Sequence, residues 1–312
     1  MDRVTTFSAY NSVIANLMAS ESRQNQAQIQ VSSGKIGSDL KGFSDNAEAL
    51  TATKTLMTRV DGYLQNAKSL QTRMDAQNLA LNQVLDAGTQ ARQAIANAIA
   101  TGKGDGLMIE LNSYLGQAAA ALNTQQNGRY VFAGGKVNTP PVAVQDITGL
   151  LSPPAGGVFQ NDQLTPTAQL DETTTLKTGQ LASDVGGDLF NAISSVATFD
   201  QGAGGPLNGQ LTQTQITFLT NALHDFDAAN ATVTTAVANN GLAQNRVDQA
   251  VTTQQDRQTT LQTMVGNMTD VDMAEAASRL SQAQVALQAS ARIFASLQST
   301  SLLNYLSGTT GG

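Results

Sequence analysis

The sequence predicts a mainly α-helical protein with a β-rich insert near its middle. All six prolines lie between Pro140 and Pro206, and residues 1–139 and 207–312 contain none. Proline removes a backbone donor and clashes with the preceding turn, so it is excluded from helix interiors. Two long proline-free arms around a segment rich in Pro and Gly therefore indicate helical arms that flank a non-helical insert.

The N-terminal arm predicts three helices, over residues 7–31, 47–100 and 107–126. Between residues 47 and 100, apolar or small polar side chains recur at alternating steps of three and four, which makes one face of a long helix. The stripe consists of Leu50, Thr53, Met57, Val60, Leu64, Ala67, Gln71, Met74, Asn78, Leu81 and Leu85. The Gly-rich residues 32–46 predict a flexible connector, and Gly88 is a weak point within the long helix.

The C-terminal arm repeats this organisation. Helical periodicity runs over residues 212–237, pauses at residues 239–241 (Asn-Asn-Gly) and resumes over 242–268. We expect Thr269 or Asp270 to cap a last helix that continues to about Leu306. After Arg279 this helix has a single charged residue, so it needs neighbours. We therefore expect both chain ends to be disordered in the monomer and to fold on assembly.

The middle of the chain predicts a small β-rich domain over residues 137–210, where Thr, Val and Leu are broken by Gly and Pro. Residues 1–42 and 270–312 then form a terminal domain in which the helical ends of the chain come together, and residues 43–136 and 211–269 form a helical bundle.

The composition excludes several classes of function. The chain has no Cys and a single His, His224. Metal sites and most acid–base catalysis draw on these residues, so we expect no metal, no cofactor and no enzymatic activity. The pairs Asp225/Asp227 and Asp270/Asp272 do not continue as calcium loops and are interpreted as helix-start carboxylates. An enzyme hidden in the insert, with a metal-supported carboxylate site, stays as an alternative.

Charge and hydropathy also limit the partners. Residues 137–230 carry nine acidic side chains and one basic side chain, Lys177, which disfavours nucleic acid. No apolar run approaches the ~20 residues that cross a bilayer. The N-terminus lacks the pattern of a cleaved signal peptide. A membrane-surface protein with amphipathic helices stays as an alternative, although its helices normally carry Lys- and Arg-rich faces.

Both arms resemble the terminal regions of bacterial flagellar axial proteins, the flagellin-like superfamily of flagellins and hook–filament junction proteins. Three segments carry the resemblance: VSSGKIGSDLKGFSDNAEAL (residues 31–50), GLAQNRVDQ (241–249) and MTDVDMAEAASRLSQAQVALQAS (268–290). Within this group, NGRYVFAGGKVNTPP (127–141) and SLLNYL (301–306) are similar to the junction proteins known as hook-associated protein 3. GFSDN stands where those proteins have Asp-Asp-Pro, so flagellin, the filament subunit, stays as the alternative.

The resemblance implies a structural subunit of the extracellular flagellum that self-assembles into a ring or tube and joins hook to filament. It implies, as partners, further copies of the chain, flagellin, a neighbouring hook-associated protein, an export chaperone and the flagellar secretion apparatus. It also implies export without a cleaved signal. For the fold, it implies that the paired N- and C-terminal helices (residues 1–42 and 270–312) form a coiled-coil assembly domain, with a helical-bundle middle layer around it and a variable outer domain (residues 137–210) that points outward. The assembly interface expected on the terminal helices is Val13, Ile14, Leu17, Leu280, Leu287, Phe294, Leu297, Leu302, Leu303, Tyr305 and Leu306.

Overall fold

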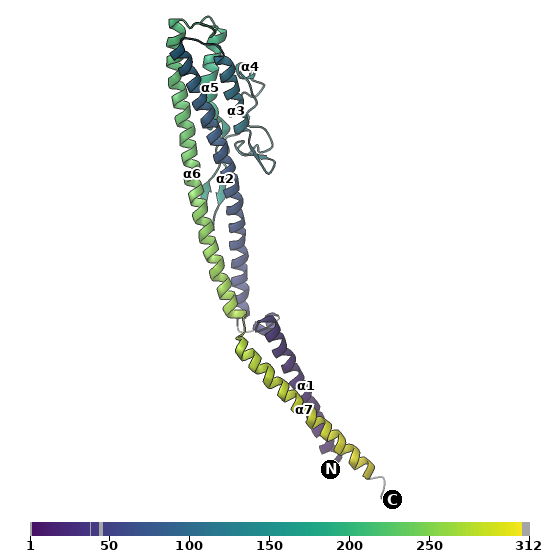
Figure 1. Ribbon diagram of the computed structural model, residues 1–312. Coiled ribbons are helices and arrows are strands. Elements are labelled where there is room, and N and C mark those ends of the chain that lie inside the picture. Colours follow the sequence, from purple (N-terminus) through teal and green to yellow (C-terminus); the bar gives the residue numbers. More distant parts are fainter. Residues whose placement is uncertain (1, 38, 44–45, 308–312) are drawn as a thin grey trace. The chain divides into compact units, whose positions relative to one another are not determined.

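The computed structural model describes residues 2–37, 39–43 and 46–307 (Figure 1). It confirms a mainly helical fold with a small β insert. The elements in chain order are α1 (Asp2–Ser33), the 3-10 helix η1 (Leu40–Phe43), α2 (Ala47–Thr101), α3 (Leu107–Leu122), β1 (Gln125–Gln126), β2 (Arg129–Tyr130), α4 (Ile147–Leu151), β3 (Thr167–Gln169), β4 (Thr175–Lys177), α5 (Ala182–Gln201), α6 (Gln213–Thr269) and α7 (Met273–Ser307).

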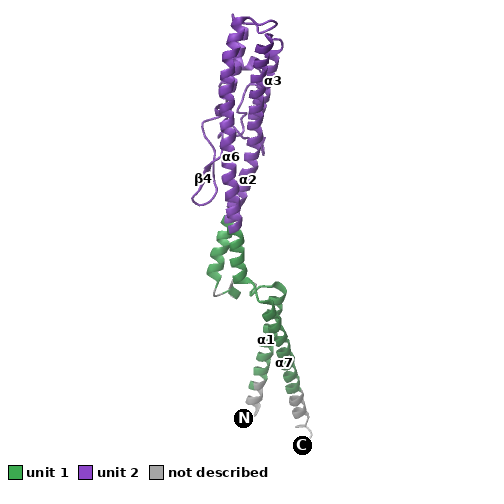
Figure 2. Ribbon diagram, turned by 60° about the vertical axis from the view of Figure 1, so that its left-hand side comes forward, with its two compact units in different colours: residues 1–59, 257–312 green, residues 60–256 purple. Residues whose placement is uncertain are grey.

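The chain divides into two compact units, coloured separately in Figure 2. Unit 1 contains residues 1–59 and 257–312, and unit 2 contains residues 60–256. Both ends of the chain therefore belong to the same unit. The finer division into three domains stays a prediction.

In unit 1, helices α1 and α7 lie side by side and run in opposite directions (Figures 1 and 2). Three contacts establish the direction, because positions that advance along the N-terminal arm meet positions that move back toward the start of α7. These contacts join Tyr10 to Phe294, Ser20 to Ser290 and Lys35 to Asp270. The N-terminal and C-terminal helices thus form an antiparallel pair within one chain.

The segment that follows α1 is held in place by the segment between α6 and α7. The Ile36 amide donates to the Thr269 carbonyl at 2.8 Å, and the Val271 amide donates to the Gly34 carbonyl at 3.0 Å. Farther along, a Cβ added to Gly37 would lie 2.8 Å from the Cα of Gly42, so two glycines allow this close backbone approach. The expectation of a flexible connector is therefore wrong for residues 34–36. The Gly34 carbonyl and the Ile36 amide both form hydrogen bonds with the backbone between α6 and α7.

Unit 2 is organised by α2 and α6, which also run antiparallel. The Gln71 side chain donates to Asp248 at 2.8 Å, and one turn later the Gln244 side chain donates to Asp75 at 3.1 Å. Nearer the other end, Arg92 forms a bidentate ion pair with Asp227. Each step forward along α2 is matched by a step back along α6, which fixes the register of the two helices.

The core of unit 2 lies where α3 and α5 pack onto this pair. The face predicted for α3 is confirmed, because its inward residues are buried: Leu111, Leu115, Ala118, Ala119 and Leu122. The predicted stripe of α2 is also confirmed, with every member buried or half-buried. Phe132, which precedes the insert, and Phe190, which lies within it, add large aromatic side chains that are fully buried.

Two predicted interruptions are absent, because α2 and α6 are continuous. Gly88 lies inside α2, where a Cβ would overlap the Asn230 side chain of α6. It marks a close approach of the two helices and does not break α2. The pause predicted at residues 239–241 is wrong for a related reason. The side chain of Asn240 is buried and donates to the Met74 carbonyl at 3.1 Å, so Asn240 stabilises helix contact there.

Within the described residues, the strands form two short antiparallel hairpins, one before the insert and one inside it. Strands β1 and β2 meet around Asn127 and Gly128, whose positive φ angles of 52° and 73° suit a two-residue turn. Strands β3 and β4 pair from Thr167 to Lys177. Leu170 and Leu176, at the second hairpin, pack in a small buried cluster with side chains of α2 and α6.

Candidate functional site

The contact between α1 and α7 is the strongest candidate for a functional surface. The ring centroids of Tyr10 and Phe294 are 5.6 Å apart with planes inclined by 39°. The hydroxyls of Ser20 and Ser290 lie 3.3 Å apart, close enough for a hydrogen bond. Small side chains allow this approach, since Ala27 is buried along the seam. The pairing therefore combines aromatic contact near the chain ends with close packing farther along.

Seven of the eleven predicted interface residues are described, and all seven are half-buried: Val13, Ile14, Leu17, Leu280, Leu287, Phe294 and Leu297. The remaining four lie outside the residues whose side chains are described: Leu302, Leu303, Tyr305 and Leu306. The members of this set lie at different levels along the helix pair. Leu280 lies about 21 Å along α7 from Phe294. It is therefore not level with Val13, and its neighbours Arg279 and Ala283 share a recess with Ala27.

Tyr10 is a member of this surface that the predicted set lacks. Tyr10 lies three residues before Val13, on the same helix face as Val13, Ile14 and Leu17. The periodicity of the N-terminal helix could therefore have identified it.

Unit 1 exposes large apolar side chains on both helices of the pair. The exposed fractions are 65% for Met18, 49% for Ile29, 65% for Val285 and 54% for Ile293. Pairing within one chain therefore leaves these four large apolar side chains exposed to water.

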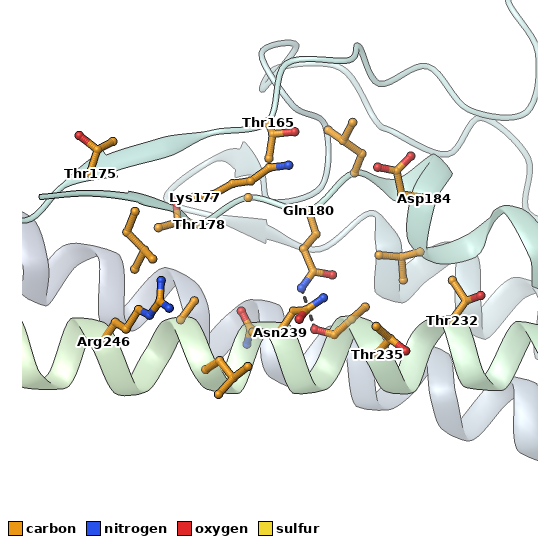
Figure 3. Close-up of a pocket in the computed structure, with 18 residues that line it drawn as sticks. Thr165, Thr175, Lys177, Thr178, Gln180, Asp184, Thr232, Thr235, Asn239 and Arg246 are labelled. Carbon is orange, nitrogen blue, oxygen red and sulfur yellow. Dashed lines mark hydrogen bonds between the residues drawn. The ribbon is translucent and has the colours of Figure 1, made fainter.

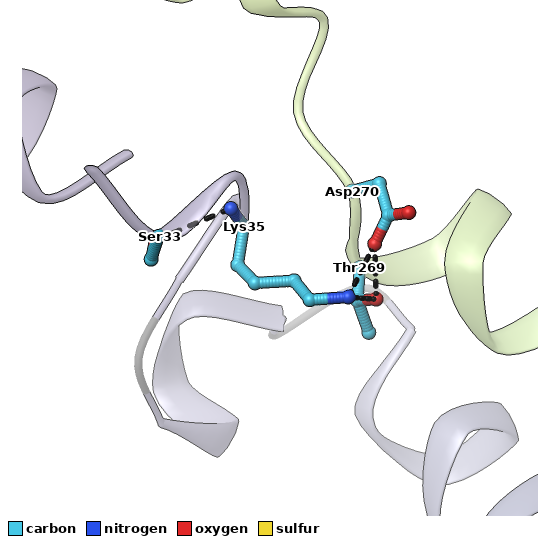
Figure 4. A network of polar contacts seen from close by, with 4 residues as sticks. All are labelled: Ser33, Lys35, Thr269 and Asp270. Carbon is cyan, nitrogen blue, oxygen red and sulfur yellow. Dashed lines mark hydrogen bonds and ion pairs between the residues drawn. The ribbon is translucent and has the colours of Figure 1, made fainter. Parts of the chain in front are cut away.

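Lys35 connects the two segments at the end of this pair (Figure 4). Its Nζ donates to Thr269 Oγ1 at 3.1 Å and forms an ion pair with Asp270 Oδ1. The Thr269 hydroxyl also donates to Asp270 at 2.9 Å. The hydrogen bond from Lys35, followed by that from Thr269, holds the pKa of Asp270 below its usual 3.8. The network joins the end of α6 to the segment after α1.

The start of α7 is capped by Asp272, not by Thr269 or Asp270 as predicted. Asp272 Oδ1 accepts from the amides of Ala274 at 2.8 Å and Glu275 at 3.2 Å. The Asp270 carboxylate instead forms an ion pair with Lys35. The helix-start interpretation is thus correct for Asp272, whereas it is wrong for Asp225 and Asp227, which lie inside α6.

A cavity of about 550 Å³ in unit 2 lies between β4, α5 and α6 (Figure 3). Lys177, Asp184 and Arg246 line it together with several threonines. Gln180 reaches across it and donates to the Ala236 carbonyl of α6 at 2.8 Å. His224 is not among its lining residues. Within the described ranges, no group of three or more His, Cys, Asp or Glu side chains is arranged to hold a metal.

No helix in the described part of the chain is both long and apolar enough to cross a bilayer.

Comparisons with known proteins bear on the C-terminal arm and on the fold. Residues 223–306 match the family described as the bacterial flagellin C-terminal helical region. A search of curated proteins found no match to this sequence. A solved structure described as a flagellar hook-associated protein from Vibrio parahaemolyticus is 16% identical with a TM-score of 0.58, over 71% of this chain and 96% of that chain. FlgL from Bacillus cereus is 15% identical with a TM-score of 0.53, over 70% and 99%. At these identities the structural likeness concerns the fold.

Proposed function

We propose that this chain is a non-enzymatic structural subunit of the bacterial flagellum and that it forms the junction between hook and filament. The observation that carries the role as an assembling structural subunit is the antiparallel pair of α1 and α7 in unit 1. This pair brings both ends of the chain together and leaves large apolar side chains exposed. A surface of this kind is expected where further copies pack.

The comparisons support the flagellar assignment from two directions. The family match covers residues 223–306, which include all of α7 except Ser307 and much of α6. Two solved structures with a similar fold are a hook-associated protein and FlgL, and each is covered over nearly its whole length. The segment YVFAGG (residues 130–135) adds the resemblance to junction proteins, and Phe132 within it is a fully buried core residue.

Assembly would proceed through the terminal helices. We propose that the predicted set, from Val13 to Leu306, together with Tyr10, contacts neighbouring copies of the chain in a ring or tube. The apolar surface removed from water would supply the driving force, at about 25 cal/mol per Å² of apolar area. The acidic insert would face solvent. Flagellin and a neighbouring hook-associated protein would bind above and below the ring, outside the cell.

Exposed apolar helices also require protection before assembly. We propose that an export chaperone covers α7 in the cytoplasm and that the chain leaves through the flagellar secretion apparatus without a cleaved signal peptide. The long run without charge after Arg279, interrupted only by Arg292, is the feature that such a chaperone would recognise.

Flagellin, the filament subunit, is the second candidate function. The match of residues 223–306 to the flagellin C-terminal region favours it specifically. The two roles differ in position within the flagellum and in copy number, whereas the helix pair serves both equally well.

A deletion strain distinguishes the two roles. If the chain is the junction protein, cells without it retain hooks, lack filaments and release filament protein into the medium. If the chain is flagellin, the same cells lack filaments and release no filament protein. Re-expression of the full chain is the control, and unchanged flagella in the deletion strain would contradict both roles.

A further inference from the structure

A second cavity in unit 2 has a distinctive charge. It measures about 510 Å³ and is bounded by α2, the β1–β2 hairpin and β3. Arg73 of α2 and Arg129 of β2 both line it, and none of its lining residues is acidic. This is unusual in a chain whose net charge is −7. The cavity is a cationic site next to an acidic insert.

Neither guanidinium has a carboxylate partner among the residues that the structure describes. Arg73 is half-buried, and its Nη2 donates to the Val131 carbonyl at a long 3.4 Å. Burial, followed by the charge of Arg129, lowers the pKa of Arg73. By contrast, Arg92 on the same helix forms a bidentate pair with Asp227. The two arginines of the cavity therefore repel each other, and an anion between them would relieve this repulsion.

The remaining polar side chains suit a ligand that carries hydroxyls. Ser69, Gln126, Asn127 and Tyr130 line the same cavity. In the described part of the chain their side chains have no hydrogen-bond partner. Amides and hydroxyls both donate and accept, which is what sugar hydroxyls require. The planar fork of arginine matches a carboxylate in a bidentate manner.

We propose that this cavity binds a sugar acid, with its carboxylate held by Arg73 and Arg129 and its hydroxyls held by the neighbouring amide and hydroxyl side chains. The volume lies within the range of small-molecule sites, roughly 300–1,000 Å³. A concave site of this kind favours a small ligand over a carboxylate side chain presented by a second copy of the chain. The inference does not depend on the flagellar role.

An NMR titration of the full-length chain tests the proposal. Galacturonate is added while the Nε–Hε resonances of the arginines are followed, and galactose serves as the neutral probe. We expect saturable shifts at Arg73 and Arg129 with galacturonate and none with galactose. Arg129→Gln, which changes an exposed side chain, should weaken binding at least tenfold. Arg246→Gln removes an arginine of the other cavity and should leave binding unchanged.

Three results would overturn the proposal. The first is the absence of saturable shifts with galacturonate in a chain whose circular dichroism is that of a folded helical protein. The second is equal binding of galactose, which would remove the role of the carboxylate. The third is loss of self-assembly in Arg129→Gln without galacturonate binding to the parent chain, which would assign the arginine pair to a carboxylate of a neighbouring copy.

Discussion

Tyr10 and Phe294 are 284 positions apart in the sequence, yet their rings pack with centroids 5.6 Å apart. The contact joins α1 to α7 near the two ends of the chain. Because neither ring is fully buried in the single chain, each can also contact a further copy. The same two rings thus stabilise the pair and contribute to the proposed assembly surface.

Phe294→Ala should weaken the pairing of α1 with α7. Loss of the aromatic contact costs about 0.5–1.5 kcal/mol beyond the apolar area exposed. Hydrogen exchange of the α1 amides around Tyr10 is the measurement, and we expect faster exchange in the variant. Val285→Ala is the matched control, since that side chain of α7 is 65% exposed. Equal effects of the two substitutions would contradict the assigned seam.

Asp272→Ala should destabilise the first turn of α7. The carboxylate accepts from two amides there, and loss of such a cap costs about 0.5–2 kcal/mol. Asp272→Asn is the control, because asparagine caps about as well as aspartate. Exchange of the Ala274 and Glu275 amides should accelerate in the alanine variant alone. Equal acceleration in both variants would show that the charge of Asp272, and not its capping hydrogen bonds, protects these amides.

Much of this fold follows from local pattern. The burial of α3 follows from apolar residues at helical spacing, and the end of α2 follows from the glycines after Thr101. The errors occurred where a tertiary contact outweighs a local preference. The sequence around Asn240 predicts a break in the helix. In the structure, the Asn240 side chain donates a hydrogen bond to the Met74 carbonyl, 166 positions away in the sequence. A sequence scanned along its length does not show that partner.

For the contact between α1 and α7, the helix faces could be predicted from the sequence, whereas the register between the two helices could not. Val13, Ile14 and Leu17 were expected from the resemblance to flagellar axial proteins, and their spacing along one helix is a local property of the sequence. The register between α1 and α7 depends on packing of distant segments, and it places Phe294 beside Tyr10. The arginine pair of the second cavity was not predicted either, since Arg73 and Arg129 approach each other only after the β1–β2 hairpin folds toward α2.

Lys35→Gln should lower stability in a manner that depends on pH. The pKa of Asp270 lies below its usual 3.8 in the folded chain because Lys35 and Thr269 hydrogen-bond its carboxylate. A lowered pKa contributes stability above 3.8, and this contribution is lost as the pH falls through the folded-state value. Thermal unfolding should therefore separate wild type from variant at neutral pH, by a small margin because the pair is exposed, and the gap should close on acidification.

Lys54→Gln removes the same charge from an exposed position of unit 1 and is the control for this series. It should show no such convergence. A gap between Lys35→Gln and wild type that stays constant well below pH 3.8 would show that the ion pair with Asp270 is not its source.

Gly88→Ala should have an effect that depends on Asn230. Alanine is favoured over glycine in a helix interior by up to about 1 kcal/mol, but its Cβ would overlap the Asn230 carboxamide. Asn230 Oδ1 is buried without a partner within the described residues. We expect Gly88→Ala to be neutral or destabilising in wild type and stabilising in an Asn230→Ala background. Urea unfolding of the wild type, the two single variants and the double variant measures the coupling, and additive effects would contradict the close approach.

Immunogold electron microscopy tests the proposed junction role most directly. An epitope tag inserted in the exposed loop at residues 152–156 leaves α1 and α7 unaltered. The account predicts a single cluster of gold where the hook meets the filament. Gold along the whole filament would contradict the junction role and establish flagellin, and the absence of gold from flagella would contradict a flagellar role altogether.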